Sequence, residues 1–324
     1  MSEYTLNPAQ ILGEALASAG LFPSPTNYRT ALNRIEEQGS LAVDDLSILF
    51  ESETWYLANN SLPKAYISGD LKRIFGFGKC TTDFLVAYTC LNSSEEGHWR
   101  VRTAGGLANF IVAVYDQFME NGNGDDILPD CTLYRLRSFS ANKTLAIEKN
   151  IDARRRVIEY LVQKYFETLS PLVNEKNQRL FVLLNRCINR MQDAERRTLN
   201  AEVCLNRRTW LRKSGLPFVT MGFPVWFEAN NMEGSTVRGH IHWMYRIGRL
   251  LGFVDDFVDY SSDLLNNKNN SLVGLTPGAI VSLANDIARE GTKLQAIWRT
   301  RVDSTAFASC GSVFGALLAS WVGM

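Results

Sequence analysis

The stretch 247–263 reads IGRLLGFVDDFVDYSSD and joins an apolar run directly to four acids. Asp255, Asp259 and Asp263 recur every four residues, which places them on one face of a helix, and Asp256 lies beside them. The residues between the acids are mostly apolar, whereas a solvated run of charge would include lysine and arginine. The stretch therefore predicts a helix that presents carboxylates to the inside of a helical bundle.

A second acidic pair follows another apolar run, in the stretch 105–120, which reads GGLANFIVAVYDQFME. Asp116 and Glu120 are four residues apart and so share one face of a helix. Two such carboxylates repel each other and raise each other's pKa unless a positive group lies between them. A hard divalent cation such as Mg²⁺ would meet this need. The alternative is a helix end that reaches solvent, where acids are common.

Helical spacing dominates the rest of the chain. In the stretch 153–169, Val157, Leu161, Tyr165 and Leu169 recur every four residues, with charged residues between them. Alternation typical of strands is scarce, and only 9 prolines occur in 324 residues. Loops or helix breaks are expected where Gly, Pro and Asn cluster, which includes 215–217, 230–231 and 266–270. The pattern predicts one all-α domain over residues 1–324.

Charge and composition exclude several classes of protein. Lys plus Arg and Asp plus Glu both total 34, so the net charge is zero and a strongly basic nucleic-acid binder is excluded. The 6 cysteines form no CxxC pair, and with 3 histidines they offer no obvious zinc site. Free thiols and the lack of a secretory pattern at the N-terminus favour a cytoplasmic location.

The uncharged stretch 304–324 approaches the length of a membrane span. It is rich in serine and glycine, whereas a helix facing lipid would favour leucine and isoleucine. A buried C-terminal helix is therefore favoured over a tail anchor, and no stable membrane span is expected.

The two acidic clusters together predict a larger metal site than either cluster alone. If their helices face each other, the acids could hold several Mg²⁺ ions. Mg²⁺ binds few carboxylates and completes its coordination with water and substrate phosphates. The substrate would then be strongly anionic, and a diphosphate fits best.

These motifs resemble those of the trans-prenyl diphosphate synthases and the class I terpene synthases. The segment 255–259, DDFVD, is similar to the family's second DDxxD motif, and Asp263 stands where a further Asp is frequent. Asp116 to Glu120 resembles a degenerate first motif, in which Gln117 replaces the inner acid. Upstream, the segment 213–216, KSGL, resembles the family's Lys-Thr-Gly-x-Leu helix break, and Lys268 falls near the lysine that follows the second motif. The resemblance covers residues 105–270.

The resemblance implies an isoprenoid synthase-like bundle around a central cavity, a prenyl diphosphate substrate and a homodimer. It implies several Mg²⁺ ions, for which Mn²⁺ could substitute. The implied metal ligands are Asp116, Glu120, Asp255, Asp256, Asp259 and Asp263, of which Asp116, Glu120, Asp255 and Asp259 would be catalytic. The implied substrate-binding residues are the basic side chains Lys213, Arg208, Arg212, Arg249 and Lys268 and the aromatic side chains Phe110, Phe218 and Trp226. Core packing is the alternative role for the aromatic residues.

Departures from the family pattern bear on the reaction. Elongating members carry paired arginines after the first motif, where 121–126 here reads NGNGDD, and a Gln before the second motif, where Gly252 stands. The site for a second diphosphate thus looks lost, and a class I terpene synthase is predicted. A prenyl diphosphate synthase is the alternative if Lys64, Lys72, Arg73 and Lys79 converge near the first motif.

Two further alternatives remain. A coupling enzyme of the squalene or phytoene synthase kind would suit the spacing of the first motif, and Gln117 gives weight to a non-catalytic helical subunit. In the stretch 215–224, Pro217 and Pro224 each remove an amide donor, so either a broken helix or a plain kink between helices is expected there.

Overall fold

The computed structural model describes residues 7–18, 33, 35–37, 70–89, 91–120, 153–199, 207–229, 232–266 and 270–301. This part of the chain is mostly helical and contains no strand, so the predicted all-α class is confirmed. Its elements are α1 (Pro8–Ser18), α5 (Asp70–Thr89), α6 (Glu95–Glu120), α8 (Ala153–Leu169), the 3₁₀ turn η5 (Ser170–Leu172), α9 (Gln178–Leu199), α10 (Arg207–Glu228), α11 (Gly234–Leu265) and α12 (Pro277–Arg301).

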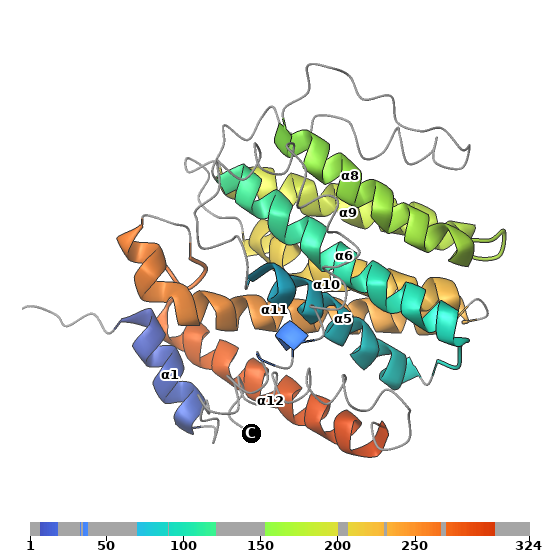
Figure 1. Cartoon of the computed structure of the whole chain (residues 1–324). Coiled ribbons are helices and arrows are strands. Elements are labelled where there is room, and N and C mark those ends of the chain that lie inside the picture. The colour runs from blue at the N-terminus through green and yellow to red at the C-terminus, as the bar shows by residue number, and fades with distance from the viewer. Residues whose placement is uncertain are drawn as a thin grey trace, which may run out of the picture.

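Helix α10 is the centre of the arrangement. It packs against α5, α6, α9 and α11, while α8 lies on the outside against α6 (Figure 1). The stretch 216–227 is apolar on every side, and Val219, Met221, Phe223, Val225 and Phe227 are almost completely buried. A helix that is apolar all round is stable only inside a protein, which explains why the other helices surround this one.

The predicted break at 215–217 is wrong, because Gly215, Pro217 and Pro224 all lie inside the continuous helix α10. Proline removes one backbone donor and normally disfavours the helix interior. Here neighbouring helices surround α10 and hold it in place. Gly215 allows close packing, since a Cβ atom there would lie 2.7 Å from the ring of Tyr245 on α11.

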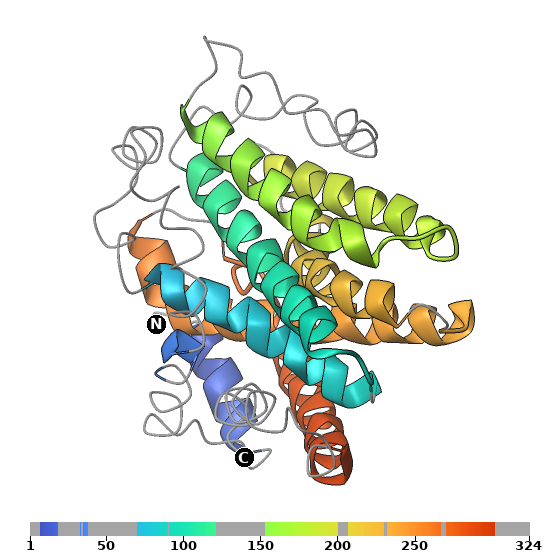
Figure 2. The same cartoon turned by 45° about the vertical axis from the view of Figure 1, so that its right-hand side comes forward.

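The outer helices show the amphipathic pattern that the sequence predicts. Helix α8 spans the predicted residues 153–169, and its stripe residues Val157, Leu161, Tyr165 and Leu169 are buried. Helix α9 buries one face against α10 and exposes charged residues on the other. Figure 2 shows α8 and α9 side by side above α10 and α11.

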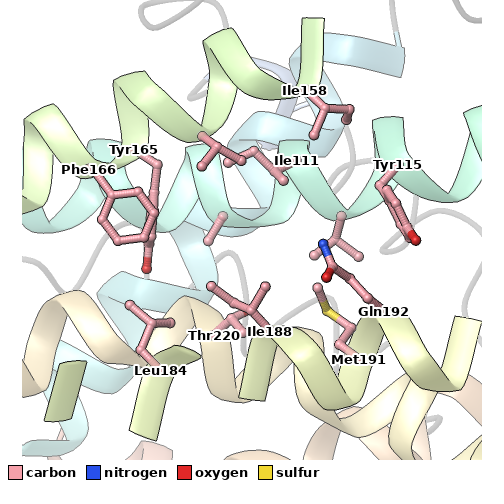
Figure 3. A pocket seen from close by; sticks show the side chains of 13 residues that line it. Ile111, Tyr115, Ile158, Tyr165, Phe166, Leu184, Ile188, Met191, Gln192 and Thr220 are labelled. Atoms are coloured by element: carbon pink, nitrogen blue, oxygen red, sulfur yellow. The ribbon is translucent and has the colours of Figure 1, made fainter. Parts of the chain in front are cut away.

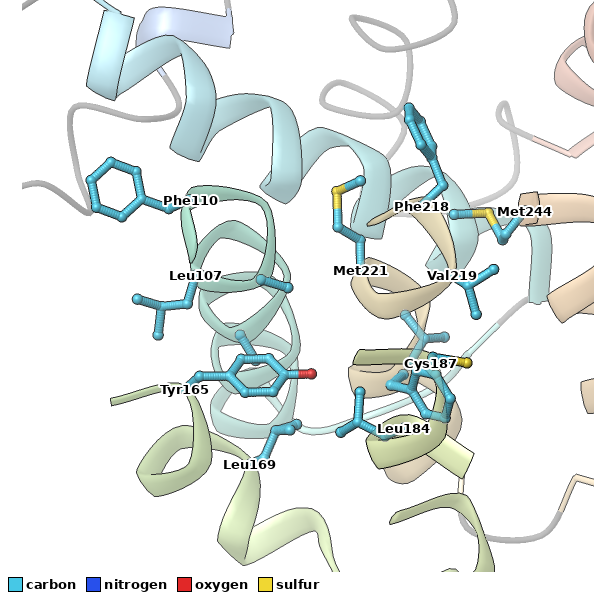
Figure 4. Packing of buried hydrophobic residues seen from close by; sticks show 14 of the residues in the cluster. Leu107, Phe110, Tyr165, Leu169, Leu184, Cys187, Phe218, Val219, Met221 and Met244 are labelled. Atoms are coloured by element: carbon cyan, nitrogen blue, oxygen red, sulfur yellow. The ribbon is translucent and has the colours of Figure 1, made fainter. Parts of the chain in front are cut away.

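Two apolar clusters hold the helices together. The larger one joins α5, α6, α8, α9, α10 and α11 (Figure 4). The smaller one joins Leu12 and Leu16 of α1 to Phe253 of α11 and to Ile280 and Ile287 of α12. None of the described helices is both long enough and apolar enough to cross a membrane. The stretch 304–324 lies outside the described residues.

Small residues let α10 and α11 approach closely. A Cβ atom on Gly248 would lie 2.6 Å from Cδ2 of Phe218 and 2.8 Å from the carbonyl oxygen of Ser214. One turn later, a Cβ atom on Gly252 would lie 2.5 Å from Cβ of Ser214. These two glycines set the distance between the helix that carries Lys213 and the helix that carries the second acidic cluster.

Gly248→Ala should therefore destabilise the protein by about 2 kcal/mol, because the added methyl group forces apart two packed helices. Gly239→Ala in the same helix is the matched control, since no atom lies within 4 Å of its Cβ position. In the control variant, the free energy of unfolding should rise by about 1 kcal/mol, because alanine has a higher helix propensity than glycine. Urea unfolding measures both, and equal midpoints for the two variants would contradict the packing argument.

Candidate functional site

One lysine joins three helices at one end of the bundle. Lys213 of α10 places its Nζ atom 3.1 Å from Oδ1 of Asp116 on α6 and 2.7 Å from Oε1 of Glu195 on α9. The Glu195 side chain is only 6% exposed, whereas Lys213 and Asp116 keep 29% and 31% of theirs exposed. The group thus lies at the rim of the core, where charges interact more strongly than in free solution.

Protonation within this group follows from burial and charge. Burial and then the charge of Asp116 raise the pKa of Glu195 well above its usual value, and Lys213 only partly offsets them. Burial would lower the pKa of Lys213, but Asp116 and Glu195 together raise it. Lys213 therefore stays positively charged, and Glu195 is a weakened acid beside it.

Glu195 is a site residue that the sequence interpretation missed. It follows Leu184, Ile188 and Met191 at helical spacing and so continues the apolar stripe of α9. An acid on the buried face of an amphipathic helix needs a partner, because an unpaired buried charge is costly. An acidic residue at an apolar position of this stripe was the sequence signal from which a buried ion pair could have been predicted.

The second acidic cluster is on α11, which, like α6, packs against α10. Asp255 and Asp259 of α11 are exposed at their helix surface, yet protein atoms crowd the Asp255 carboxylate. This crowding, followed by repulsion from Asp259, Asp256, Asp263 and Asp116, raises the pKa of Asp255 to about 7. The repulsion from Asp116 means that two carboxylates 139 residues apart in the chain act on each other in the folded protein.

The other two acids of this cluster hold the turn that follows α11. Oδ2 of Asp256 accepts a hydrogen bond from the amide of Ser271 at 3.1 Å. The Asn270 side-chain amide donates to Oδ2 of Asp263 at 2.9 Å and to the carbonyl oxygen of Asp256 at 2.7 Å. Burial raises the pKa of Asp256 to about 6, although the Ser271 bonds lower it. Asp256 and Asp263 thus have structural partners as well as their predicted role as metal ligands.

The predicted basic residues divide into those the structure describes and those it does not. Arg249 lies with Cζ 5.9 Å from the ring centre of Tyr245, and Arg212 is half-buried next to Lys213 in α10. The side chains of Arg208 and Glu120, and all of Lys268, lie outside the described part. Of the cations named for a second substrate, Arg73 binds Glu36 at 3.0 Å. Lys64 lies outside the described residues as well.

An apolar pocket begins beside the Lys213 group. It lies between α6, α8, α9 and α10 and holds about 530 Å³ of space that no atom fills, its open mouth included. Tyr115, Met191 and Gln192 line the end nearest the acids, and Tyr165, Phe166 and Leu184 line the other end (Figure 3). The rest of the lining comes from Ala108, Ile111, Val112, Ile158, Val162, Ile188 and Thr220. Most of the lining side chains are apolar.

The predicted aromatic residues are not part of this lining. Phe110 packs 6.3 Å from Phe75, between ring centres, and Phe218 lies edge-on to Phe77 at 5.8 Å. Trp226 packs against Phe223 at 5.0 Å, and all three predicted side chains are buried. The structure gives them the alternative role in core packing, and their contact with substrate stays a prediction.

The acids fit a divalent cation in part. Among the described residues, no group of three or more His, Cys, Asp or Glu side chains is arranged to hold a metal ion. Mg²⁺, however, is commonly bound by one or two carboxylates plus water and phosphate oxygens. Asp255 and Asp259 offer such a pair one turn apart, and a cation would relieve the repulsion that raises the pKa of Asp255.

Comparisons with protein-family models, with curated proteins and with solved structures each found no match. The resemblance to isoprenoid synthases therefore depends on the sequence motifs alone.

Lys213→Met should leave the Asp116 and Glu195 carboxylates without their cation. The free energy of unfolding should therefore fall by about 2 kcal/mol at neutral pH. The cost is less than for a fully buried pair because Lys213 and Asp116 are partly exposed. Adding Glu195→Gln should recover part of the loss, because it removes one of the repelling charges. Lys164→Met is the control, since Lys164 pairs with Glu167 at the surface at 3.0 Å and should cost under about 0.5 kcal/mol. Equal losses in chemical denaturation would contradict this account.

Asp255 should make stability depend on pH. Its pKa is about 7 in the folded protein and 3.8 ordinarily, so the folded state binds more protons between these values and loses stability as pH rises through them. Asp255→Asn abolishes this titration. As pH rises from about 4 to about 7, the free energy of unfolding of the variant should increase relative to the parent by on the order of 1 kcal/mol, a small value because solvent screens the exposed carboxylate.

Thermal unfolding over this pH range measures the difference. Asp286→Asn is the control, because Asp286 pairs with Arg289 on the surface of α12. A parent and an Asp255→Asn variant that respond identically to pH would contradict the raised pKa.

Proposed function

We propose that the protein is a Mg²⁺-dependent class I terpene synthase, which ionises a linear prenyl diphosphate and cyclises or rearranges its hydrocarbon chain. The observation that carries the proposal is that carboxylates from two motifs far apart in the sequence, Asp116 and Asp255, repel each other in the folded protein, and that Lys213 binds Asp116. An apolar pocket lies next to this charged group. A diphosphate head and a hydrocarbon tail require these two surroundings side by side.

Each part of the site has a role in this proposal. Asp255 and Asp259 would hold Mg²⁺, with Asp116 close by, and the bound metal would supply Lewis-acid stabilisation to the departing diphosphate. The Lys213 ammonium, fixed by Asp116 and Glu195, would donate hydrogen bonds to diphosphate oxygens and offset their charge. The side chains of the pocket would exclude water from the reactive chain.

Gly252 favours the terpene synthase over an elongating enzyme. A glutamine at this position would place its Cβ atom 2.5 Å from Cβ of Ser214, so α10 and α11 would have to move apart. The glycine thus allows close helix packing at a position where elongating prenyl diphosphate synthases carry a polar side chain. Arg73, one of the cations that a second diphosphate would need, is paired with Glu36.

Incubation with Mg²⁺ and prenyl diphosphates of ten, fifteen and twenty carbons should release diphosphate and form a hydrocarbon or alcohol without a second substrate. Asp255→Asn should lower turnover by on the order of 100-fold, because it weakens the stabilisation of charge on the leaving group. Asp286→Asn is the matched change outside the site and should leave turnover unaltered.

The other results would identify the alternatives. Product formed only with added isopentenyl diphosphate would indicate an elongating prenyltransferase. Diphosphate never released at any chain length, with binding retained, would indicate a non-catalytic subunit. Full activity of Asp255→Asn would overturn the assignment of that carboxylate.

A further inference from the structure

A buried hydroxyl group in the apolar pocket lacks a partner. Tyr165 of α8 is 3% exposed and lines the pocket, and its hydroxyl oxygen has no hydrogen-bond partner among the residues that the structure describes. Its only described electrostatic neighbour is the buried thiol of Cys187, which is a weak hydrogen-bonding group. Burial raises the pKa of Tyr165, so the hydroxyl keeps its proton and can donate it to a hydrogen bond.

Such a group is unusual in a folded protein. Leaving a buried donor unpaired costs about 1–3 kcal/mol, and most buried polar groups are paired for this reason. Of the other hydroxyl groups in the pocket, Thr220 donates to the carbonyl oxygen of Pro217 at 2.7 Å. The Tyr115 hydroxyl also has no hydrogen-bond partner among the described residues, but the charged Arg196 side chain lies near it. The lining around Tyr165, including Phe166 and Leu184, is apolar. The missing partner is therefore expected to arrive with a ligand.

The position of Tyr165 shows which part of a ligand it would meet. Figure 3 shows Tyr165 and Tyr115 at opposite ends of the pocket. Ile158 and Tyr165 both line it and are two helical turns apart, which corresponds to about 10 Å along α8. The charged group of Lys213, Asp116 and Glu195 lies beyond the Tyr115 end, since Tyr115 feels the charges of Glu195 and Asp116.

We infer that Tyr165 selects ligands whose apolar chain ends in an oxygen function, a hydroxyl or a carbonyl, at the end remote from the charged group. The orientation of the chain rests on the proposed function, in which the diphosphate binds beside Lys213. The substrate class of this site is accordingly an end-oxygenated chain. A chain that ends in hydrocarbon would leave the Tyr165 hydroxyl unpaired, and sites that hydrogen-bond a ligand discriminate strongly against such analogues.

The test uses probes that need neither metal nor diphosphate. Hexan-1-ol and 1-chlorohexane are similar in length, but only the alcohol forms strong hydrogen bonds. Their dissociation constants are measured by ligand-observed NMR on the full chain and on Tyr165→Phe. Tyr160→Phe is the matched control, because Tyr160 is on the same helix and does not line the pocket.

The expected result is that Tyr165→Phe reduces the preference for the alcohol over the chloride about tenfold, which is the effect of one hydrogen bond. Tyr160→Phe should leave the preference unchanged. Tyr165→Phe should also fold with undiminished thermal stability, because it removes a group that forms no bond in the empty pocket. A loss of stability with an unchanged preference would mean that the hydroxyl already has a partner, and would overturn the inference.

Two more outcomes are informative. Failure of both probes to bind the parent chain would also overturn the inference, since the pocket would then accept no such ligand. A Tyr165-dependent preference in a protein that never binds or turns over prenyl diphosphates would uphold Tyr165 as a selective residue while the proposed function fails. The two proposals can therefore fail separately.

Discussion

The position of one ammonium group determines how the site is built. Lys213 lies between carboxylates of two other helices, so α6, α9 and α10 meet at a single charged point. Removing charges from water is costly and is offset only when the partners are held in good geometry. The packing of α10 among four neighbours provides that geometry, because the helix that carries Lys213 cannot shift without disturbing the core. The close contact of α10 with α11, through Gly248 and Gly252, then brings the second set of acids to the same end.

The sequence predicted the helical class and several elements for physical reasons that the structure confirms. The four-residue recurrence of apolar side chains in 153–169 matches the buried face of α8. Each acidic cluster does lie on a helix, and the charge of Asp116 acts on Asp255. That the two helices face each other stays a prediction. Asn266 does follow the end of α11. These features are local or periodic, and a single sequence carries such information. The isoprenoid synthase-like fold and the metal remain predictions.

Features that depend on tertiary packing were not predictable in the same way. Pro217 suggested a break, but the burial of α10 on all sides outweighs the cost of the lost backbone bond. Glu195 was not predicted as a site residue, because its partners come from two other helices. Asp256 and Asp263 read as metal ligands, whereas their hydrogen bonds to Asn270 and Ser271 become visible only once the turn is formed. Propensity and spacing give no account of such long-range partners.

The pairing of α1 with α12 has a consequence for how the chain is made. These helices contact each other and share the smaller apolar cluster, although one comes near the start of the described chain and the other at its end. During synthesis the apolar face of α1 leaves the ribosome long before α12 exists. Because domains mature from the N-terminal side as the chain grows, this cluster can close only after the other helices have been translated. Until that moment Leu12 and Leu16 lack their partners on α12. The newly made protein therefore depends on α12, its last described helix, to bury the apolar face of α1.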